Sequence, residues 1–242
     1  MPSGAPPRYQ QIADELRQNI ERAIYQIGDR LPTETELSKR FDVNRHTLRR
    51  AIELLRHEGL LRVDRGRGTF VAAAPITYAI GKRVRYNEML KAQGLTPQQQ
   101  TLRLLEMPAD EAVAKRLAIS VGDPVVLFER LSLVEGSPLS LASSYFPIEL
   151  MPDIAVQCEA CSSISQMMRS CYDFDHIRQS TRISARVVQP RDANYLQVAL
   201  SSPILLTESV NVNQLSDVIE YGVSRFRCDR MELVFETSSA EE

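Results

Sequence analysis

The sequence of 242 residues predicts an α+β protein built in two parts. Residues 8–72 have the pattern of three helices followed by a short hairpin. A run of small residues from Ala72 to Pro75 then marks a boundary. Beyond it, strands joined by hairpins are interspersed with helices, as in an antiparallel sheet flanked by helices. We therefore expect one domain over residues 8–72, a linker over 73–82 and a second domain over 83–238.

The first helix is predicted from apolar residues that recur at helical spacing between Tyr9 and Ile24, which gives it one buried face. Gly28 and Asp29 end this helix. Leu31 precedes a proline and is therefore expected to be extended, because the residue before proline avoids the α region.

The second helix, over about 34–41, begins with a capping box. Thr33 can accept a hydrogen bond from the start of the helix, and Glu36 follows three residues later to complete the motif. Asp42 and Val43 then make a tight turn, for which aspartate is suitable because it tolerates the left-handed conformation.

The third helix starts after Asn44, a good N-cap residue, and ends before Gly59. Its inward face is a stripe at i, i+3, i+4 and i+7: Leu48, Ala51, Ile52 and Leu55. Two short strands follow over 60–63 and 69–72, and the turn between them contains Gly66 and Gly68, as expected for a hairpin.

The second part has less regular patterns. Helices are predicted over about 85–93, 110–117, 164–172 and 192–200. Strands are predicted over 125–134, 139–146, 181–188, 204–213 and 218–226, with a short strand near 232–236.

Charge is distributed unevenly between the two parts. The whole chain has a net charge of −2, but residues 1–75 contain 13 Lys/Arg against 10 Asp/Glu, whereas residues 76–242 contain 16 against 21. Within residues 44–69 there are seven arginines and three acids. A protein that contacts nucleic acid with one part needs a basic patch rather than a basic whole.

The sequence contains no apolar run of membrane-spanning length and no secretory signal, so we expect a cytoplasmic protein with reduced cysteines. Cys158 and Cys161 form a CxxC pair, but His176 is the only histidine nearby, and the pair lacks the second ligand pair typical of zinc sites. Buried thiols are the favoured interpretation, with a metal or redox sensor as the alternative. We expect no cofactor.

A short helix, a tight turn and a helix with a basic start form a helix-turn-helix, whose second helix enters the major groove of DNA. Arg45 and Arg49 share one face of that helix and could each hold a guanine with two hydrogen bonds. His46 and Thr47 could contact a base edge or a phosphate. Arg50 lies further round and is more suited to a phosphate or to solvent.

The hairpin turn supplies Arg65, Gly66 and Arg67, which are suited to backbone contacts with DNA. The competing interpretation of the third helix is an ordinary solvated surface with extra arginines. The complete arrangement of helices, turn and basic hairpin is more specific than any one of its pieces.

These residues resemble the winged helix-turn-helix domain of GntR-family bacterial transcription regulators. The motifs are GDRLPTETEL, VNRHTLRRAI and GRGTFV. The resemblance implies that DNA is contacted by Arg45, His46, Thr47, Arg49, Arg50, Arg65, Gly66 and Arg67. The family commonly has arginine in the LPxEREL step, where this sequence has Thr35, so one phosphate contact is expected to be missing.

Residues from about 80 to 236 resemble the ligand-sensing UTRA domain of the HutC subfamily, whose fold is like that of chorismate lyase. The motifs are FERLSLVEGSPLSLASSYFP and VIEYGVSRFRCDRMELVFE. NRHTLRRAI and TRISAR are most similar to the phosphonate-metabolism repressors. The resemblance implies effector contacts from Tyr86, Asn87, Arg130, Ser132, Ser144, Tyr145, Glu220 and Phe226.

Two further arginines, Arg182 and Arg186, lie an even number of residues apart on one predicted strand and therefore face the same side. They could complete a pocket for an anion, or they could pair with acids such as Glu220.

We therefore expect a non-enzymatic, ligand-responsive regulator of transcription. The resemblance implies a homodimer that binds double-stranded operator DNA, repression of a catabolic or uptake operon, and a small anionic effector. A phosphonate, a phosphate ester, a sugar phosphate and a carboxylate all fit an arginine-lined pocket. The alternatives are a repressor of the same family that responds to a sugar phosphate or an amino-acid catabolite, and an enzyme like chorismate lyase.

Overall fold

The computed structural model describes residues 6–64, 66–72 and 75–235. The chain divides after Pro75 into two compact units, each with its own core. None of the helices in the described ranges combines the length and the hydropathy that crossing a membrane would need.

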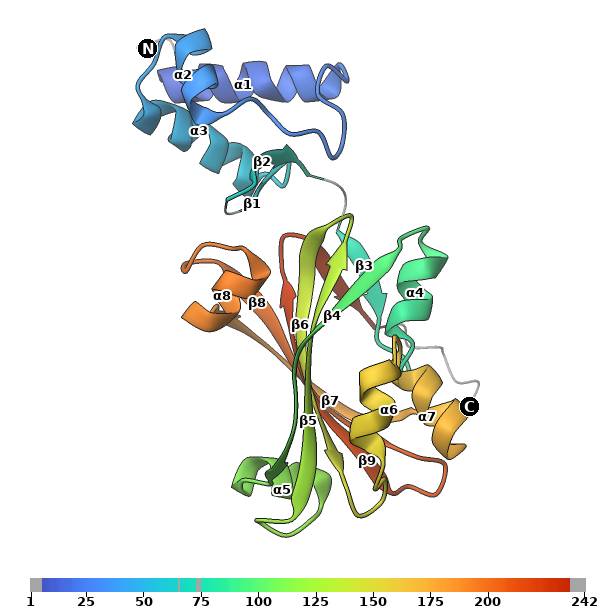
Figure 1. The fold of residues 1–242 in the computed structure, drawn as a ribbon. Coiled ribbons are helices and arrows are strands. Elements are labelled where there is room, and N and C mark those ends of the chain that lie inside the picture. The colour runs from blue at the N-terminus through green and yellow to red at the C-terminus, as the bar shows by residue number, and fades with distance from the viewer. Residues whose placement is uncertain (1–5, 65, 73–74, 236–242) are drawn as a thin grey trace, which may run out of the picture. The chain divides into compact units, whose positions relative to one another are not determined.

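The first unit contains three helices and a two-stranded antiparallel hairpin (Figure 1). The elements are α1 (Arg8–Glu21), α2 (Glu34–Phe41), α3 (Arg45–His57), β1 (Leu61–Asp64) and β2 (Gly68–Val71). Their apolar faces meet in one core, to which α3 contributes the predicted stripe: Leu48, Ala51, Ile52 and Leu55, all buried. The predicted helix-turn-helix with its hairpin is therefore confirmed.

Local hydrogen bonds explain where α2 and α3 begin. The Thr33 amide donates to the Glu36 carboxylate (2.7 Å), and the Glu36 amide donates back to the Thr33 hydroxyl (3.3 Å). Asp42 ends α2 with φ of +50°, the left-handed conformation expected for the tight turn. The Asn44 side chain then accepts from the Thr47 amide (2.8 Å) and starts α3.

The second unit is organised around a six-stranded antiparallel sheet with the strand order β4-β5-β6-β9-β8-β7. The strands are β4 (Pro97–Pro108), β5 (Pro124–Val134), β6 (Ser137–Pro147), β7 (Ile177–Val187), β8 (Pro203–Val212) and β9 (Val218–Arg227). A separate parallel pair joins β3 (Ile76–Ala79) to β10 (Met231–Val234). Residues 76–79, assigned to the linker by the sequence analysis, therefore form a strand.

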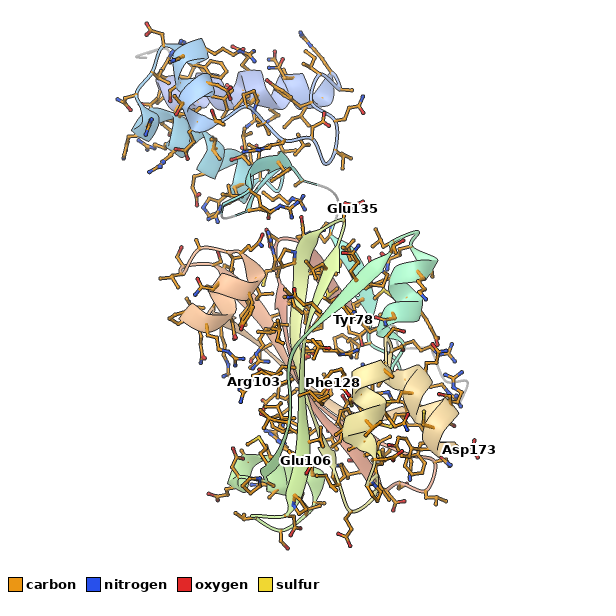
Figure 2. All side chains as sticks on the ribbon, viewed as in Figure 1. Tyr78, Arg103, Glu106, Phe128, Glu135 and Asp173 are labelled. Atoms are coloured by element: carbon orange, nitrogen blue, oxygen red, sulfur yellow. The ribbon has the colours of Figure 1, made fainter. Side chains whose placement is uncertain are left out.

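Helices cover both faces of the large sheet (Figure 1). On one side lie α4 (Tyr86–Ala92), α6 (Ile154–Ala160) and α7 (Ile164–Tyr172); on the other lie α5 (Glu111–Leu117) and α8 (Pro190–Leu196). Figure 2 shows Tyr78 and Phe128 on the side of α4, α6 and α7, and Arg103 on the opposite side. This α+β architecture is the predicted fold class.

Besides β3, two elements were absent from the sequence prediction. β4 is an edge strand whose first half, PQQQT, has no apolar alternation; it pairs along the whole of β5 through a bulge between Thr101 and Arg103. α6 has only seven residues, too few to establish a helical period. In addition, β7 starts at Ile177, four residues before the predicted strand, and this difference affects the site described below.

Candidate nucleic-acid interface and ligand cavity

The outer face of α3 presents the predicted polar residues to solvent. Arg45, His46 and Arg49 are exposed and Thr47 is half-buried, while the opposite face packs in the core. The helix begins at Arg45, so these side chains lie in its first two turns, the part that a helix-turn-helix inserts into the major groove.

Two of the arginines are held by side chains from α2. Arg45 Nη2 donates to the Thr35 hydroxyl (3.2 Å), and Arg49 Nε donates to the Glu34 carboxylate (2.8 Å). Thr35, which replaces the arginine common in the family, therefore orients Arg45. An exposed ion pair such as Arg49–Glu34 is worth only about 0–1 kcal/mol, so it can open when a nucleic acid offers a better partner.

Arg50 has a different environment. Its guanidinium lies 4.0 Å from the centre of the Tyr9 ring on α1, in a cation–π contact. This places Arg50 at the side of the α3 face, where it is better suited to a phosphate than to a base.

The hairpin turn contains two glycines that the backbone requires. Gly66 and Gly68 have φ of +77° and +117°, which other residues rarely adopt. A Cβ atom on Gly68 would also lie 2.8 Å from Nε of the exposed Arg30 side chain, which would have to shift. Arg67 lies beside the Phe70 ring, 5.9 Å from its centre, whereas Arg65 falls outside the described residues.

The second unit contains a cavity between its sheet and the elements α4, α7 and β3. About 840 Å³ of space inside its outline is not filled by protein atoms, a volume that includes open solvent at the mouth. The middle of its floor is hollow because the central strands present small side chains there: Ala142, Ser144, Thr207, Ser209, Gly222 and Ser224.

At one end of the cavity, Arg130 extends from β5 across the ring of Phe128, with 4.7 Å between the guanidinium and the ring centre. Its Nη1 atom is buried and has no hydrogen-bond partner among the described residues. Burial lowers the pKa of Arg130, but a guanidinium remains charged at any physiological pH. A buried cation of this kind is a strong attractor for an anion.

Another arginine, Arg178, lies near the start of β7 and also lines the cavity. Its Nη1 donates to the Gly81 carbonyl (2.7 Å) and its Nη2 to the Tyr78 hydroxyl (2.8 Å). Both bonds fix the guanidinium plane, while Nε is buried and has no partner among the described residues.

The cavity also contains a buried ion pair. His176 Nε2 lies 2.7 Å from the Glu220 carboxylate, which also accepts from Asn211 Nδ2 (2.6 Å). Burial by itself raises the pKa of Glu220, but the charge of His176 and hydrogen bonds from His176, Ser144 and Asn211 outweigh it and hold the pKa at about 2. Glu220 is therefore ionised and already neutralised by His176.

His176 also contacts a serine, and the geometry of the three groups bears on the enzyme alternative. Ser165 Oγ lies 3.0 Å from His176 Nδ1, but the same hydroxyl donates to the Val84 carbonyl (2.7 Å). Since its proton is used there, Ser165 accepts from the imidazole. The arrangement holds a charged histidine in place and does not activate a nucleophile, which would need the histidine to accept.

One wall of the cavity is aromatic. Tyr78, Tyr86 and Phe226 pack with ring centres 5.4 to 6.3 Å apart. The Tyr86 hydroxyl donates to Ser132 (3.2 Å) and is hydrogen-bonded with Ser140 (3.0 Å), and burial raises its pKa. The wall therefore has rigid apolar rings whose polar atoms are already satisfied.

Seven of the ten predicted effector-binding residues line this cavity: Tyr86, Asn87, Arg130, Ser132, Ser144, Glu220 and Phe226. The structure corrects the other three. Arg182 and Arg186 do share one face of β7, as their spacing predicts, but it is the face turned away from the cavity. Arg182 lies opposite Glu208 in the register, so the alternative pairing with Glu220 is excluded as well.

Tyr145 is the third correction. It follows Ser144 on β6, so it faces the other side of the sheet, where it stacks on Tyr221 with 5.8 Å between ring centres. Both belong to the cluster that packs against α5.

The sequence analysis missed His176, Arg178, Asn211, Ser163 and Ser165. Asn211 had a usable signal, since Thr207, Ser209 and Asn211 alternate with larger side chains on a predicted strand. Arg178 had no such signal in the sequence, because the strand was predicted to start at residue 181. Its position depends on the true start of β7.

The cysteine motif does not form a metal site within the described residues. Among the described residues, no three His, Cys, Asp or Glu side chains meet in a way that could hold a metal ion. Cys158 on α6 is fully buried in the core, and burial raises its pKa, as expected for a structural thiol. Cys161 and Cys228 are half-buried and Cys171 is exposed, so the interpretation as buried thiols holds in full only for Cys158.

Family models match both parts of the chain. Residues 8–71 match the model described as bacterial regulatory proteins of the gntR family, and residues 92–232 match the UTRA domain. The probable transcriptional regulator PhnF of Escherichia coli is 35% identical over 237 residues, which cover 97% of each chain. The uncharacterized HTH-type transcriptional regulator RB1450 of Rhizobium meliloti is 32% identical over 95% of this chain and 94% of its own.

Solved structures give the same result for the fold. The crystal structure of PhnF from Mycobacterium smegmatis has a TM-score of 0.67 and 28% identity, covering 95% of this chain and all of that chain. Its effector domain alone has a TM-score of 0.61 and 26% identity, covering 68% of this chain.

Proposed function

The chain belongs to the gntR family of bacterial regulatory proteins, with a UTRA domain as its second part, and on this premise we propose that it is a repressor released from DNA by a small anion. It is a transcriptional regulator with one DNA-binding and one ligand-binding domain. The enzyme alternative has no support from the relatives, which are regulators.

The observation that carries the anion proposal is the buried Nη1 atom of the half-buried Arg130, which has no hydrogen-bond partner among the described residues. Glu220 is the ionised acid of the cavity lining, and His176 neutralises its charge. The charge of Arg130 is therefore not balanced, and the cavity has an excess of positive charge. A buried charge without an opposite charge is costly, and a bound anion removes that cost. Arg178 adds a second cation to the lining.

The names of the relatives suggest the chemical class. PhnF proteins occur among both the similar sequences and the similar structures, so we place a phosphonate first, and a phosphate ester second. The repressor named for mannosyl-D-glycerate transport and metabolism, 29% identical, supports the alternative of a sugar-derived effector.

We further propose that the protein acts as a cytoplasmic homodimer on an operator with two half-sites. Helix-turn-helix regulators commonly bind as dimers to half-sites about one helical turn apart. The reading residues are Arg45, His46, Thr47 and Arg49, and Arg50 with the turn residues Arg65, Gly66 and Arg67 contacts phosphate.

The test is a ligand-release assay with the intergenic DNA beside the gene, followed by fluorescence anisotropy. Methylphosphonate, inorganic phosphate, a sugar phosphate and benzoate are added to wild type, Arg130→Gln and Arg182→Gln. We expect at least one phosphonate or phosphate to release the DNA from wild type and Arg182→Gln, and to lose at least about tenfold in potency on Arg130→Gln.

Arg182→Gln is the matched control, because it removes one arginine from the opposite face of the same sheet. Equal loss in both variants would contradict the assignment of the anion to Arg130 and would indicate a general effect of charge.

A further inference from the structure

Three buried polar atoms of the cavity have no hydrogen-bond partner within the part of the chain that the structure describes: Arg130 Nη1, Arg178 Nε and Asn211 Oδ1. Buried polar atoms are nearly always paired in proteins, so each of these atoms is expected to bond to an ordered water or to a group of a bound ligand. Two of them are donors and one is an acceptor, which means that a simple anion cannot satisfy all three.

The orientation of Asn211 determines that its free atom is an acceptor. Its Nδ2 donates to Glu220 at 2.6 Å, and an ionised carboxylate can only accept. The amide therefore cannot be turned round, and Oδ1 needs a donor.

Asn211 and Arg178 are direct partners in the register of β8 and β7. Side chains in such a cross-strand pair start about 5 Å apart. The free acceptor of Asn211 and the free Nε–H of Arg178 thus lie at the same end of the cavity, where one ligand group can contact both.

Arg130 lies on β5, three strands away from β8 in the order β5-β6-β9-β8. Three strand spacings separate the two backbones by about 14 Å. The small residues of β6, β9 and β8, such as Ala142 and Gly222, keep the floor between these two ends open.

We propose that the effector is a bifunctional anion, with its charged group at Arg130 and, several bonds away, a neutral group that donates to Asn211 Oδ1 and accepts from Arg178 Nε. A terminal hydroxyl has this chemistry, since it is both donor and acceptor. The inference rests on the proposed function, because it assumes that the cavity is the effector site.

A second anionic group is disfavoured at the Asn211 end. It would offer no donor to Oδ1 and would approach the Glu220 carboxylate, which is hydrogen-bonded to the same amide. Discrimination should be strong, because a site built to bond a hydroxyl leaves its own buried groups unpaired when the hydroxyl is missing.

The experiment compares alkylphosphonates with ω-hydroxyalkylphosphonates of two to four carbons by calorimetric titration of the full chain. The two proteins, wild type and Asn211→Ala, and the two ligands, with and without the hydroxyl, form a double-mutant-type thermodynamic cycle. In wild type we expect the hydroxyl to improve Kd at least about tenfold at one chain length. In Asn211→Ala the advantage should fall to about twofold or less, while the alkylphosphonate retains its affinity because Arg130 holds it.

No advantage of the hydroxyl at any length, or the same advantage in Asn211→Ala, would overturn the inference and leave the proposed anion site intact. If no phosphonate of either series binds and small anions do not release DNA, the proposed function fails and this inference fails with it. Should Asn211→Ala not fold, Arg178→Lys serves the same cycle, since it keeps the charge and removes Nε.

Discussion

The arginines of α3 and the arginine of β5 lie in contrasting environments. Arg45 and Arg49 are exposed and rest on Thr35 and Glu34, partners that they can exchange at little cost. Arg130 is half-buried over Phe128, and its buried Nη1 has no hydrogen-bond partner in the part of the chain that the structure describes. The difference follows from exposure to solvent. A solvated guanidinium can exchange hydrogen-bond partners at little cost, whereas a desolvated guanidinium is stabilised by binding a specific anion.

The largest expected effect concerns the exposed pair. Replacing both Arg45 and Arg49 by Ala should weaken operator binding at least about 100-fold, because each bidentate contact to guanine is worth about 1–3 kcal/mol. Anisotropy at several salt concentrations measures it, with Arg22→Ala on the exposed end of the first unit as the control. Wild-type affinity and salt slope in the double variant would show that α3 does not read the operator through these residues.

Removing the Arg130 guanidinium should stabilise the folded protein, whereas the removal of a side chain from the interior usually destabilises it. Arg130→Met removes a desolvated, unpaired charge and keeps an apolar stem, so the ligand-free protein should be more stable by about 1–3 kcal/mol. Denaturant unfolding compares it with wild type and with Arg182→Met. A loss of stability would mean that the guanidinium is already well solvated or paired.

The ion pair of Glu220 and His176 should give the cavity a pH-dependent stability. Glu220 has a folded-state pKa of about 2, below its unfolded value, so its contribution is complete above the unfolded pKa and is lost as pH falls towards 2. Between pH 5 and pH 3, the melting temperature of wild type should therefore fall more than that of Glu220→Gln. Parallel curves for the two proteins would contradict the strong pairing with His176.

The smallest effect is expected at Glu34. Glu34→Gln removes the exposed ion pair with Arg49 and one negative charge near the DNA, so affinity should rise by only about two- to fivefold, and mainly at low salt. A large loss of affinity would show that Glu34 positions Arg49 more tightly than a surface pair can.

The sequence predicted the first unit closely because its signals are local. The capping box at Thr33, the left-handed turn at Asp42 and the cap at Asn44 are each decided within three or four residues. The position of the apolar stripe alone determines the outward face of α3, because the fixed helical period places the remaining residues on the opposite side.

The cavity was predicted only in part. Motif resemblance identified seven of its lining residues, and strand alternation correctly placed Arg182 and Arg186 on one face. The sequence did not show whether that face is turned towards the cavity, nor that Arg178 lines it. Both depend on where β7 starts and how it pairs with β8, since a one-residue shift moves every side chain of a strand to the other side. By itself the sequence determined the helices, caps and turns of the DNA-binding unit, because neighbours along the chain fix them. The tertiary structure decided which arginines are buried together, because that depends on strands far apart in the sequence.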